Sequence, residues 1–278
     1  MKILKGQVAL ITGASRGLGV YMARAFASRG VNLVLAARSL DAVEAVAAEL
    51  SQTGIRAIGV RADMSRDEDV KALYMRAKEA FGQVDIVINN AGIELVSHYL
   101  SLSPEDIDWV IRVNLTGPML LSRLALEDMY ERDSGHIVNI ASAAGSFPPP
   151  YSETYAATKS GLIGFTHSVR CSLRLDNKNI GASVIAPGFM DDAGMYEDMK
   201  PVARKAPWFV GSLHADVLAQ EVIKVIEKNK PIKILMPWVP TVMKVFQTAM
   251  PGTFEKVSLK IGIFRSLIDL ANHRGANA

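Results

Sequence analysis

The sequence YSETYAATK at 151–159 places two tyrosines and a lysine at helical spacing. Tyr151 and Tyr155 stand four residues apart and Lys159 follows four residues later, a spacing that puts side chains on one face of a helix. A tyrosine with its ordinary pKa of about 10 is a weak acid at neutral pH. An ammonium beside it favours the phenolate and lowers that pKa. The spacing predicts a catalytic pair of Tyr155 and Lys159, with a chance pairing in one helix as the alternative.

A glycine-rich sequence, TGASRGLG at 12–19, follows the first apolar run and opens a helical pattern. Gly13, Gly17 and Gly19 let the backbone turn tightly and approach a phosphate, which the N-terminus of the next helix attracts. The spacing is G-x-x-x-G-x-G, which differs from the more general G-x-G-x-x-G fingerprint. The loop predicts a nucleotide phosphate site, against the alternative of an ordinary strand–helix turn with incidental glycines.

The second apolar run ends in LVLAARSL, where a dinucleotide with a free ribose 2′-hydroxyl needs an acidic residue. Ala36 and Ala37 stand there instead. Arg38 and Ser39 follow, and Arg16 lies in the glycine loop. Two guanidiniums and a hydroxyl favour a phosphate, because arginine binds phosphate through two parallel hydrogen bonds. The missing carboxylate therefore favours NADP over NAD, and two solvated arginines are the alternative.

Polar residues also follow the third and fourth apolar runs, at the sheet edge where open α/β folds bind ligands. Asp63 is expected to accept a hydrogen bond from an adenine amino group, with the backbone N–H of Met64 as a donor. The competing role for Asp63 is that of a helix N-cap. In NNAG at 89–92 the last two residues leave room for a ribose, whereas Asn89 and Asn90 can tie strand ends together. For Asn89 a structural role is expected.

Seven short runs rich in apolar and β-branched residues must position these side chains. They read QVALIT, VNLVLAA, RAIGVRA, VDIVINN, GHIVNIAS, GASVIAP and IKILMP, with helical patterns such as LDAVEAVAAEL and DEDVKALYMRAKEAF between them. Nearly continuous apolar strands are typical of a parallel sheet covered on both faces. The alternation predicts a doubly wound α/β fold. We expect one catalytic domain over 1–236 and a helical extension of the same domain over 237–278.

The composition of the 278 residues, 49% hydrophobic and 21% charged, fits a globular protein and excludes disorder. The single cysteine, Cys171, excludes a disulfide framework and is expected to be a buried structural thiol in a helix. No apolar run reaches the roughly 20 residues that cross a bilayer, and no signal-peptide pattern occurs, so a cytoplasmic location is expected. From residue 230 onward, seven basic and two acidic residues give the tail a charge of +5.

Taken together, the motifs strongly resemble the short-chain dehydrogenase/reductase family. They are TGASRGLG, NNAG, VNLTG, Ser142 after GHIVNIA, YAATK and APG, in the order and spacing of that family, from about Gly6 to about Met236. The resemblance implies a Rossmann-type sheet of seven parallel strands. It also implies hydride transfer between NADP(H) and a carbonyl or alcohol, and a homodimer or homotetramer.

The resemblance also implies roles for individual residues. Tyr155 would give its proton to the developing alkoxide, and Ser142 would hydrogen-bond the same oxygen. Lys159 would lower the pKa of Tyr155 and hold the nicotinamide ribose. Asn114, at a break in a long helix, would hold a water that relays protons; a polar kink beside Gly117 is the alternative. The expected cofactor site, with no metal, comprises Gly13, Ser15, Arg16, Gly17, Leu18, Gly19, Arg38, Ser39, Asp63, Met64, Asn90, Ala91, Gly92, Tyr155, Lys159, Pro187 and Gly188.

The sequence departs from the family in APGFM at 186–190, which matches the Pro-Gly turn beside the nicotinamide. The threonine often found a few residues later is missing, and DDAGMY stands in its place. Backbone atoms of 187–190 are expected to serve instead, and a side-chain contact to the carboxamide is in question.

Segment 189–215 is expected to form the substrate lid, opposite SFPPPY at 146–151. Because ligand pockets are mostly lined by apolar side chains, the lid residues predict a hydrophobic substrate. The alternative is that they only pack the lid down. They are Phe189, Met190, Met195, Tyr196, Met199, Trp208 and Phe209.

Beyond Met236, two helical patterns are divided by MPG at 250–252. The second carries a wide apolar stripe interrupted by Lys256 and Lys260. Such a stripe can pack over the substrate mouth of its own subunit, against another subunit, or on an anionic membrane surface. Its apolar members are Phe254, Val257, Leu259, Ile261, Ile263, Phe264, Leu267, Ile268, Leu270 and Ala271.

These observations predict an NADPH-dependent carbonyl reductase, or NADP-dependent alcohol dehydrogenase, that acts on a hydrophobic substrate. One alternative is a reductase of 3-oxoacyl thioesters carried by acyl carrier protein or CoA, although the basic tail is not typical of those enzymes. Another is a non-catalytic NADP-binding regulator, against which the complete set of catalytic residues argues. Nucleic-acid binding is not expected, because the sequence has no readout motif and the body of the chain is slightly acidic.

Overall fold

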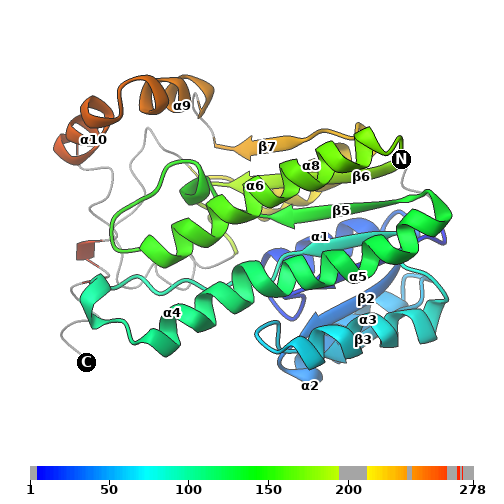
Figure 1. Cartoon of the computed structure of the whole chain (residues 1–278). Coiled ribbons are helices and arrows are strands. Elements are labelled where there is room, and N and C mark those ends of the chain that lie inside the picture. Colours follow the sequence, from blue (N-terminus) through cyan, green and yellow to red (C-terminus); the bar gives the residue numbers. More distant parts are fainter. Residues whose placement is uncertain (1–4, 194–211, 237–239, 262–267, 270, 272–278) are drawn as a thin grey trace.

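The computed structural model describes residues 5–193, 212–236 and 240–261, together with Ile268, Asp269 and Ala271. Within these residues, seven parallel strands form one sheet in the order β3-β2-β1-β4-β5-β6-β7 (Figure 1). Each strand lies within its predicted run to within one residue. The strands are β1 (Val8–Thr12), β2 (Asn32–Ala37), β3 (Ala57–Arg61), β4 (Ile86–Asn89), β5 (Gly135–Ile140), β6 (Ile180–Pro187) and β7 (Ile232–Leu235).

The helices cover both faces of the sheet, so the predicted doubly wound, Rossmann-type fold is confirmed. Side chains of β1 alternate between two cores: Ala9 and Ile11 pack with α1, α2 and α8, whereas Val8 and Leu10 pack with α3 and α5. The helices are α1 (Leu18–Ala27), α2 (Leu40–Ser51), α3 (Asp67–Phe81), α4 (Pro104–Ile111), α5 (Gly117–Arg132), α6 (Glu153–Leu175), α8 (Ala215–Glu227), α9 (Pro240–Ala249) and α10 (Pro251–Lys260).

Strand order reverses between β1 and β4, which are neighbours in the sheet. Strands β2 and β3 lie on the side of β1, and β5, β6 and β7 lie on the side of β4. The crossovers on the two sides of this point leave in opposite directions, so a crevice opens at the carboxyl ends of the strands. The residues after β1, β2, β4 and β5 therefore meet at one edge of the sheet.

The C-terminal helices lie beyond β7, at the top left of Figure 1. The predicted break holds, because α9 ends before Met250 and α10 begins at Pro251. The ring of Phe254 on α10 lies 5.8 Å from that of Phe246 and 6.4 Å from that of Phe147, which follows β5. Part of the stripe thus packs on the predicted substrate side of its own subunit. Ile263, Phe264, Leu267 and Leu270 lie outside the described residues, and the domain division at 236 stays a prediction.

The expectation of a buried cysteine is wrong: Cys171 is exposed on α6. The neighbouring residue, Arg170, faces the sheet and donates hydrogen bonds to the carbonyl of Ala182 (2.9 Å) and the side chain of Asn229 (2.6 Å). A helix turns by 100° per residue, so the residue next to an inward-facing one is directed away from the sheet.

No helix in the described part of the chain has both the length and the apolar character needed to cross a bilayer.

Candidate active site

The turn after β1 packs tightly against the residues that follow β4. Gly13 has a φ of +67°, and a Cβ there would lie 2.9 Å from the Cα of Ala91. A Cβ on Gly19 would overlap the carbonyl oxygen of Gly13. Only glycine fits either position, so the loop brings its backbone close to the sheet edge, as a phosphate-binding turn requires.

Thr12, the last residue of β1, ties this loop to the end of β4. Its hydroxyl accepts hydrogen bonds from the backbone N–H groups of Asn90 and Ala91, both at 3.0 Å. The side chain of Asn90 in turn donates to the carbonyls of Thr12 (2.8 Å) and Gly13 (3.2 Å). Sequence reasoning missed Thr12; its signal was a polar residue that ends an apolar strand beside the glycine loop.

Asn89 has the structural role expected of it. Its side-chain amide donates to Asn139 (2.7 Å) on β5, to Ser122 (3.0 Å) on α5 and to the carbonyl of Pro118 (3.4 Å). These buried bonds join the fourth and fifth strands to the covering helix.

A cavity of about 240 Å³ opens between the glycine loop and the ends of β2, β3 and β4. It brings together eleven of the predicted cofactor residues: Gly13, Ser15, Arg16, Gly17, Leu18, Arg38, Asp63, Met64, Asn90, Ala91 and Gly92. Residues that sequence reasoning had not assigned to the cofactor also line it, namely Ala36, Ala37, Ala62, Ile93 and Val113. The other predicted residues lie outside its lining: Gly19, Ser39, Tyr155, Lys159, Pro187 and Gly188.

The N-cap alternative for Asp63 is wrong, because α3 begins at Asp67 and its N-cap residue is Arg66. One carboxylate oxygen of Asp63 accepts hydrogen bonds from the backbone N–H (2.9 Å) and hydroxyl (2.7 Å) of Ser65. Its own N–H donates to Asp69 at 3.0 Å. The turn thereby holds Asp63 at the cavity wall, and its contact with an adenine stays a prediction.

Three of the four predicted catalytic residues meet at the end of β5. Ser142 follows that strand by two residues; its hydroxyl accepts from the N–H of Ala144 (3.1 Å) and is hydrogen-bonded to the Tyr155 hydroxyl. Lys159 donates to the carbonyl of Ile140 (3.0 Å), and its ammonium lies 5.6 Å from the centre of the Tyr155 ring. Tyr155 and Lys159 are 7% and 2% exposed. The half-buried Ser142 and the buried Tyr155 and Lys159 therefore form one polar cluster.

Burial dominates the protonation of this cluster. Removal from water, followed by the charge of Glu94, raises the pKa of Tyr155 above its ordinary value, and the hydrogen bond from Ser142 lowers it only in part. Burial lowers the pKa of Lys159 to about 8, against an opposing effect of Glu94. In the protein alone, desolvation of the phenolate outweighs its hydrogen bond; the lowering of the Tyr155 pKa by Lys159 together with the positive charge of an oxidised nicotinamide stays a prediction.

Glu94 is a second residue that sequence reasoning missed. Its carboxylate accepts a hydrogen bond from the Ser152 hydroxyl at 2.8 Å, one turn before Tyr155. The signal was an acidic residue two positions after NNAG.

Asn114 lies in a π-helical turn, Arg112–Thr116, between α4 and α5, which confirms the predicted break in a long helix. Its side chain accepts from the N–H of Ile93 (2.8 Å) and donates to the carbonyl of Ile93 (2.8 Å). It also donates to the Thr158 hydroxyl (3.3 Å), beside Lys159. Asn114 thus joins the loop after β4 to α6, and the proton-relaying water stays a prediction.

Tyr151 precedes α6, which begins at Glu153, so it shares no helix face with Tyr155. Its φ is +64°, its carbonyl accepts from the N–H of Ser97 (3.0 Å), and its ring meets His98 edge-on at 5.0 Å. Tyr151 therefore anchors the loop that leads into the catalytic helix.

After APG, the chain turns back into the fold. The N–H of Gly188 donates to the carbonyl of Leu235 (2.8 Å), and Met190 is buried in the core. The carboxylate of Asp192, where a hydroxyl residue was missing, accepts from the N–H of Ala215 (2.8 Å) at the start of α8. Met190 is therefore a core residue, and Phe189 is half-buried. The remaining expected lid residues lie outside the described residues: Met195, Tyr196, Met199, Trp208 and Phe209.

Comparisons with known proteins agree with this geometry. The family model described as short chain dehydrogenase matches residues 7–202. "Ketoacyl reductase HetN" of a Nostoc species is 37% identical over 236 residues, which cover 85% of this chain and 80% of that protein.

Two solved structures share the fold. A short chain dehydrogenase/reductase from Burkholderia phymatum in complex with NAD has a TM-score of 0.78 and 27% identity, over 94% of this chain and 97% of that one. A metagenomic short-chain oxidoreductase in complex with NADP has a TM-score of 0.71 and 29% identity, over 86% and 100%.

Proposed function

The chain belongs to the short-chain dehydrogenase/reductase family, and from that premise we propose that it is an NADP(H)-dependent oxidoreductase that interconverts a carbonyl and an alcohol of a hydrophobic substrate. The observation that carries the proposal is the cluster of Ser142, Tyr155 and Lys159, in which the tyrosine and the lysine are buried. A regulator that only binds a nucleotide has no use for such a cluster.

Each residue of the cluster has a distinct task in carbonyl reduction. Tyr155, protonated at neutral pH because its pKa is raised, gives its proton to the carbonyl oxygen as negative charge develops there. Ser142 donates a hydrogen bond to the same oxygen, and such fixed donors stabilise the developing charge. Lys159 orients the ribose of the cofactor, and Asn114 holds the helix in place. When bound, NADPH supplies the hydride.

The cavity supports NADP over NAD. Arg16 and Arg38 both line it, and the two residues at the end of β2, where NAD binding needs a carboxylate, are Ala36 and Ala37. A 2′-phosphate would meet two guanidiniums and no competing acidic residue at that strand end. Similar structures have been solved with either cofactor, so this chain's own residues carry the assignment.

A second candidate, a 3-oxoacyl thioester reductase, is favoured by one specific observation. The relative from Nostoc carries the name ketoacyl reductase and matches this chain over most of its length. The chemistry at the carbonyl would be the same, so only the substrate distinguishes the two candidates.

The test combines cofactor titration with a substrate panel. NADPH and NADH are titrated by their fluorescence, and NADPH oxidation is then measured with apolar ketones and with 3-oxoacyl thioesters of CoA and acyl carrier protein. We expect tighter binding of NADPH and turnover that Tyr155→Phe lowers at least a thousandfold while leaving NADPH binding unchanged. The control is Tyr99→Phe, at an exposed tyrosine outside the cavity lining. Turnover that survives Tyr155→Phe contradicts the assigned acid.

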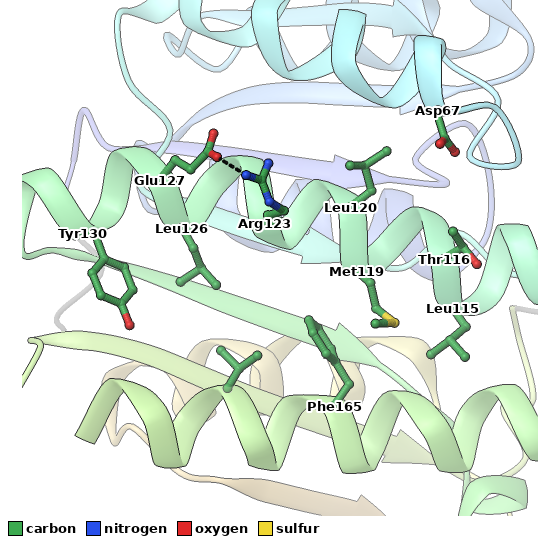
Figure 2. Close-up of a pocket in the computed structure, with 11 residues that line it drawn as sticks. Asp67, Leu115, Thr116, Met119, Leu120, Arg123, Leu126, Glu127, Tyr130 and Phe165 are labelled. Carbon is green, nitrogen blue, oxygen red and sulfur yellow. Dashed lines mark ion pairs between the residues drawn. The ribbon is translucent and has the colours of Figure 1, made fainter. Parts of the chain in front are cut away.

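We also propose that a second copy of this chain docks on the face shared by α5 and α6. A hollow of about 750 Å³ lies between these helices, and Figure 2 shows the side chains that line it. Apolar side chains line it, among them Met119, Leu120 and Phe165. Single exposed apolar residues are ordinary, but a continuous apolar hollow favours an interface.

The charges on this face fit a two-fold contact. Arg123 and Glu127 form an ion pair of 2.7 Å along the rim (Figure 2). In an interface that pairs one patch with itself, the same two residues can bind each other across the symmetry axis. Gly164, exposed in the middle of α6, has no atom within 4 Å of its missing Cβ, and a bare helix surface admits close approach of another helix. The proposed partner is therefore a second copy, in a homodimer or homotetramer.

Finally, we propose that the protein is cytoplasmic and that α9 and α10 contact an anionic membrane surface peripherally. Exposed apolar residues, Val257, Leu259 and Ile261, stand beside Lys256 and Lys260. A helix of this composition binds lipid through apolar burial together with attraction to anionic headgroups.

A further inference from the structure

Arg38, at the end of β2, does not stand alone at the mouth of the cavity. Its guanidinium carbon lies 5.8 Å from the ring centre of Trp109 on α4. This distance is within the range at which a cation over an aromatic face is attracted by the ring. Arg38 lines the cavity, whereas Trp109 is absent from its lining. Trp109 can therefore act on a bound nucleotide through Arg38, which it contacts directly.

The position of Trp109 is fixed by the start of its own helix. Ser103 and Asp106 form a capping box: the Ser103 hydroxyl accepts from the N–H of Asp106 (3.0 Å), and the Asp106 carboxylate accepts from the N–H of Ser103 (3.1 Å). Pro104 occupies the first helical position. Trp109 also packs against the core beneath α3 and α5. Trp109 is thus half-buried on a capped helix, in contrast to the exposed side chain of Arg38.

We propose that Trp109 is a positioning residue for cofactor selection: its ring holds the Arg38 guanidinium at the cavity mouth and thereby strengthens binding of a nucleotide with a ribose 2′-phosphate. This inference rests on the proposed preference for NADP.

Two physical reasons support it. An arginine that stacks on an aromatic face keeps its N–H donors at the edge of the guanidinium plane, where they can bind phosphate oxygens in pairs. Arg16 lines the same cavity, so two positive charges lie at its wall before a phosphate binds. The electron-rich face of the indole attracts one of them and offsets part of that repulsion.

The experiment measures the dissociation constants of NADPH and NADH by nucleotide fluorescence, since the variants change the tryptophan content. The proteins are the wild type, Trp109→Leu, Trp109→Phe, Arg38→Leu and the double variant Arg38→Leu/Trp109→Leu. We expect Trp109→Leu to weaken NADPH binding about two- to fivefold, the range of exposed cation–π contacts, and to leave NADH binding unchanged. Trp109→Phe, which keeps an aromatic face, should retain most of the affinity.

The double variant separates positioning from general support of the fold. If Trp109 acts through Arg38, Trp109→Leu has no further effect on the NADPH-to-NADH ratio once Arg38 is leucine. Suppose that the wild type prefers NADPH. If Trp109→Leu weakens the binding of NADPH and NADH equally, or leaves the NADPH-to-NADH ratio unchanged, only the inference on Trp109 is overturned. A wild type that binds NADH at least as tightly as NADPH overturns the proposed cofactor as well. Thermal melting of each variant verifies that it is folded.

Discussion

At the scale of single residues, burial favours the uncharged form of both Tyr155 and Lys159. The pKa of Tyr155 is raised and that of Lys159 is lowered to about 8. The tyrosine therefore keeps its proton over the whole range in which the lysine titrates. We therefore expect the protonation state of Lys159, whose ammonium donates to the carbonyl of Ile140, to set how kcat/KM changes at high pH.

We expect kcat/KM for carbonyl reduction to fall about tenfold per pH unit above about pH 8. The pKa of Lys159 is depressed, so its ammonium form is present below that pH and is lost above it. The measurement is the pH dependence of kcat/KM, with Lys159→Arg keeping its charge to higher pH. The matched control is Lys178→Arg, because Lys178 also contacts a tyrosine ring, at 5.3 Å from Tyr130, but lies away from the site. A plateau extending to pH 10 in the wild type contradicts the assignment.

At the scale of elements, the π-helical turn Arg112–Thr116 connects three parts of the site. It carries Val113 into the cavity lining and Asn114 onto the loop after β4. The following residue, Gly117, approaches the carbonyl of Met64, and a Cβ there would overlap it. The π-helical turn, with its one extra residue, thus links the cavity, the helix α6 that carries Tyr155, and the residues after β3.

Asn114→Ala should lower the free energy of unfolding by about 1–3 kcal/mol, because it leaves the part-buried N–H and carbonyl of Ile93 without their side-chain partner. Urea unfolding and NADPH oxidation measure both consequences. Asn179→Ala, at an exposed asparagine, is the control and should change stability by less than about 0.5 kcal/mol. An Asn114→Ala protein as stable as the wild type would show that these bonds contribute nothing net.

The membrane prediction belongs to α10. We expect the wild type to sediment with vesicles that contain anionic lipid, to bind neutral vesicles weakly, and to be released by salt. Leu259→Glu should lower the bound fraction several-fold, because Leu259 is 56% exposed beside Lys256 and Lys260. Leu175→Glu, at an exposed leucine on α6, should leave it unchanged. Loss of binding in both variants, or no binding by the wild type, rejects the membrane contact.

At the scale of the whole molecule, the candidate active site lies at the carboxyl edge of the sheet, and the α5–α6 face lies to one side of it. The carboxyl ends of β1, β2 and β4 form the cavity, and that of β5 carries Ser142. The apolar hollow between α5 and α6 is formed by the same two helices that hold Asn114 and Tyr155 in place. The proposed assembly and the proposed catalysis would thus depend on the same helices.

Met119→Glu should convert the proposed dimer into a monomer, because a carboxylate in the apolar hollow loses its hydration when a second copy docks. Light scattering after gel filtration gives the mass directly. Met75→Glu, at a methionine that is 63% exposed on α3 and lies outside the hollow, is the matched control. A wild type that is monomeric at all concentrations, or a Met119→Glu protein that keeps the wild-type mass, rejects this interface.

Much of the architecture could be predicted from local sequence patterns. The seven apolar runs became the seven strands, and the pattern at 67–81 became α3. The parallel sheet followed, because short apolar strands alternating with helices have few right-handed solutions. The motif residues lie at the expected strand ends. Each motif directly follows a strand in the chain, and a parallel sheet brings the ends of those strands to one edge.

Features that depend on contacts between distant residues could not be predicted. Arg170 faces the sheet and Cys171 faces away from it. The periodicity of α6, in which polar and apolar residues are mixed, does not predict this orientation. Thr12 and Glu94 acquire partners 78 and 58 residues away, which no local pattern encodes.

The sequence by itself therefore determined the fold class, the order of the motifs along the strands and the candidates for the reacting groups. Only the tertiary structure decided how those groups behave. It buried Tyr155 and Lys159, and it placed Trp109 beneath Arg38. The physical reason is that periodicity and spacing act within one element, whereas solvation and side-chain contact arise between elements that meet only in the folded protein.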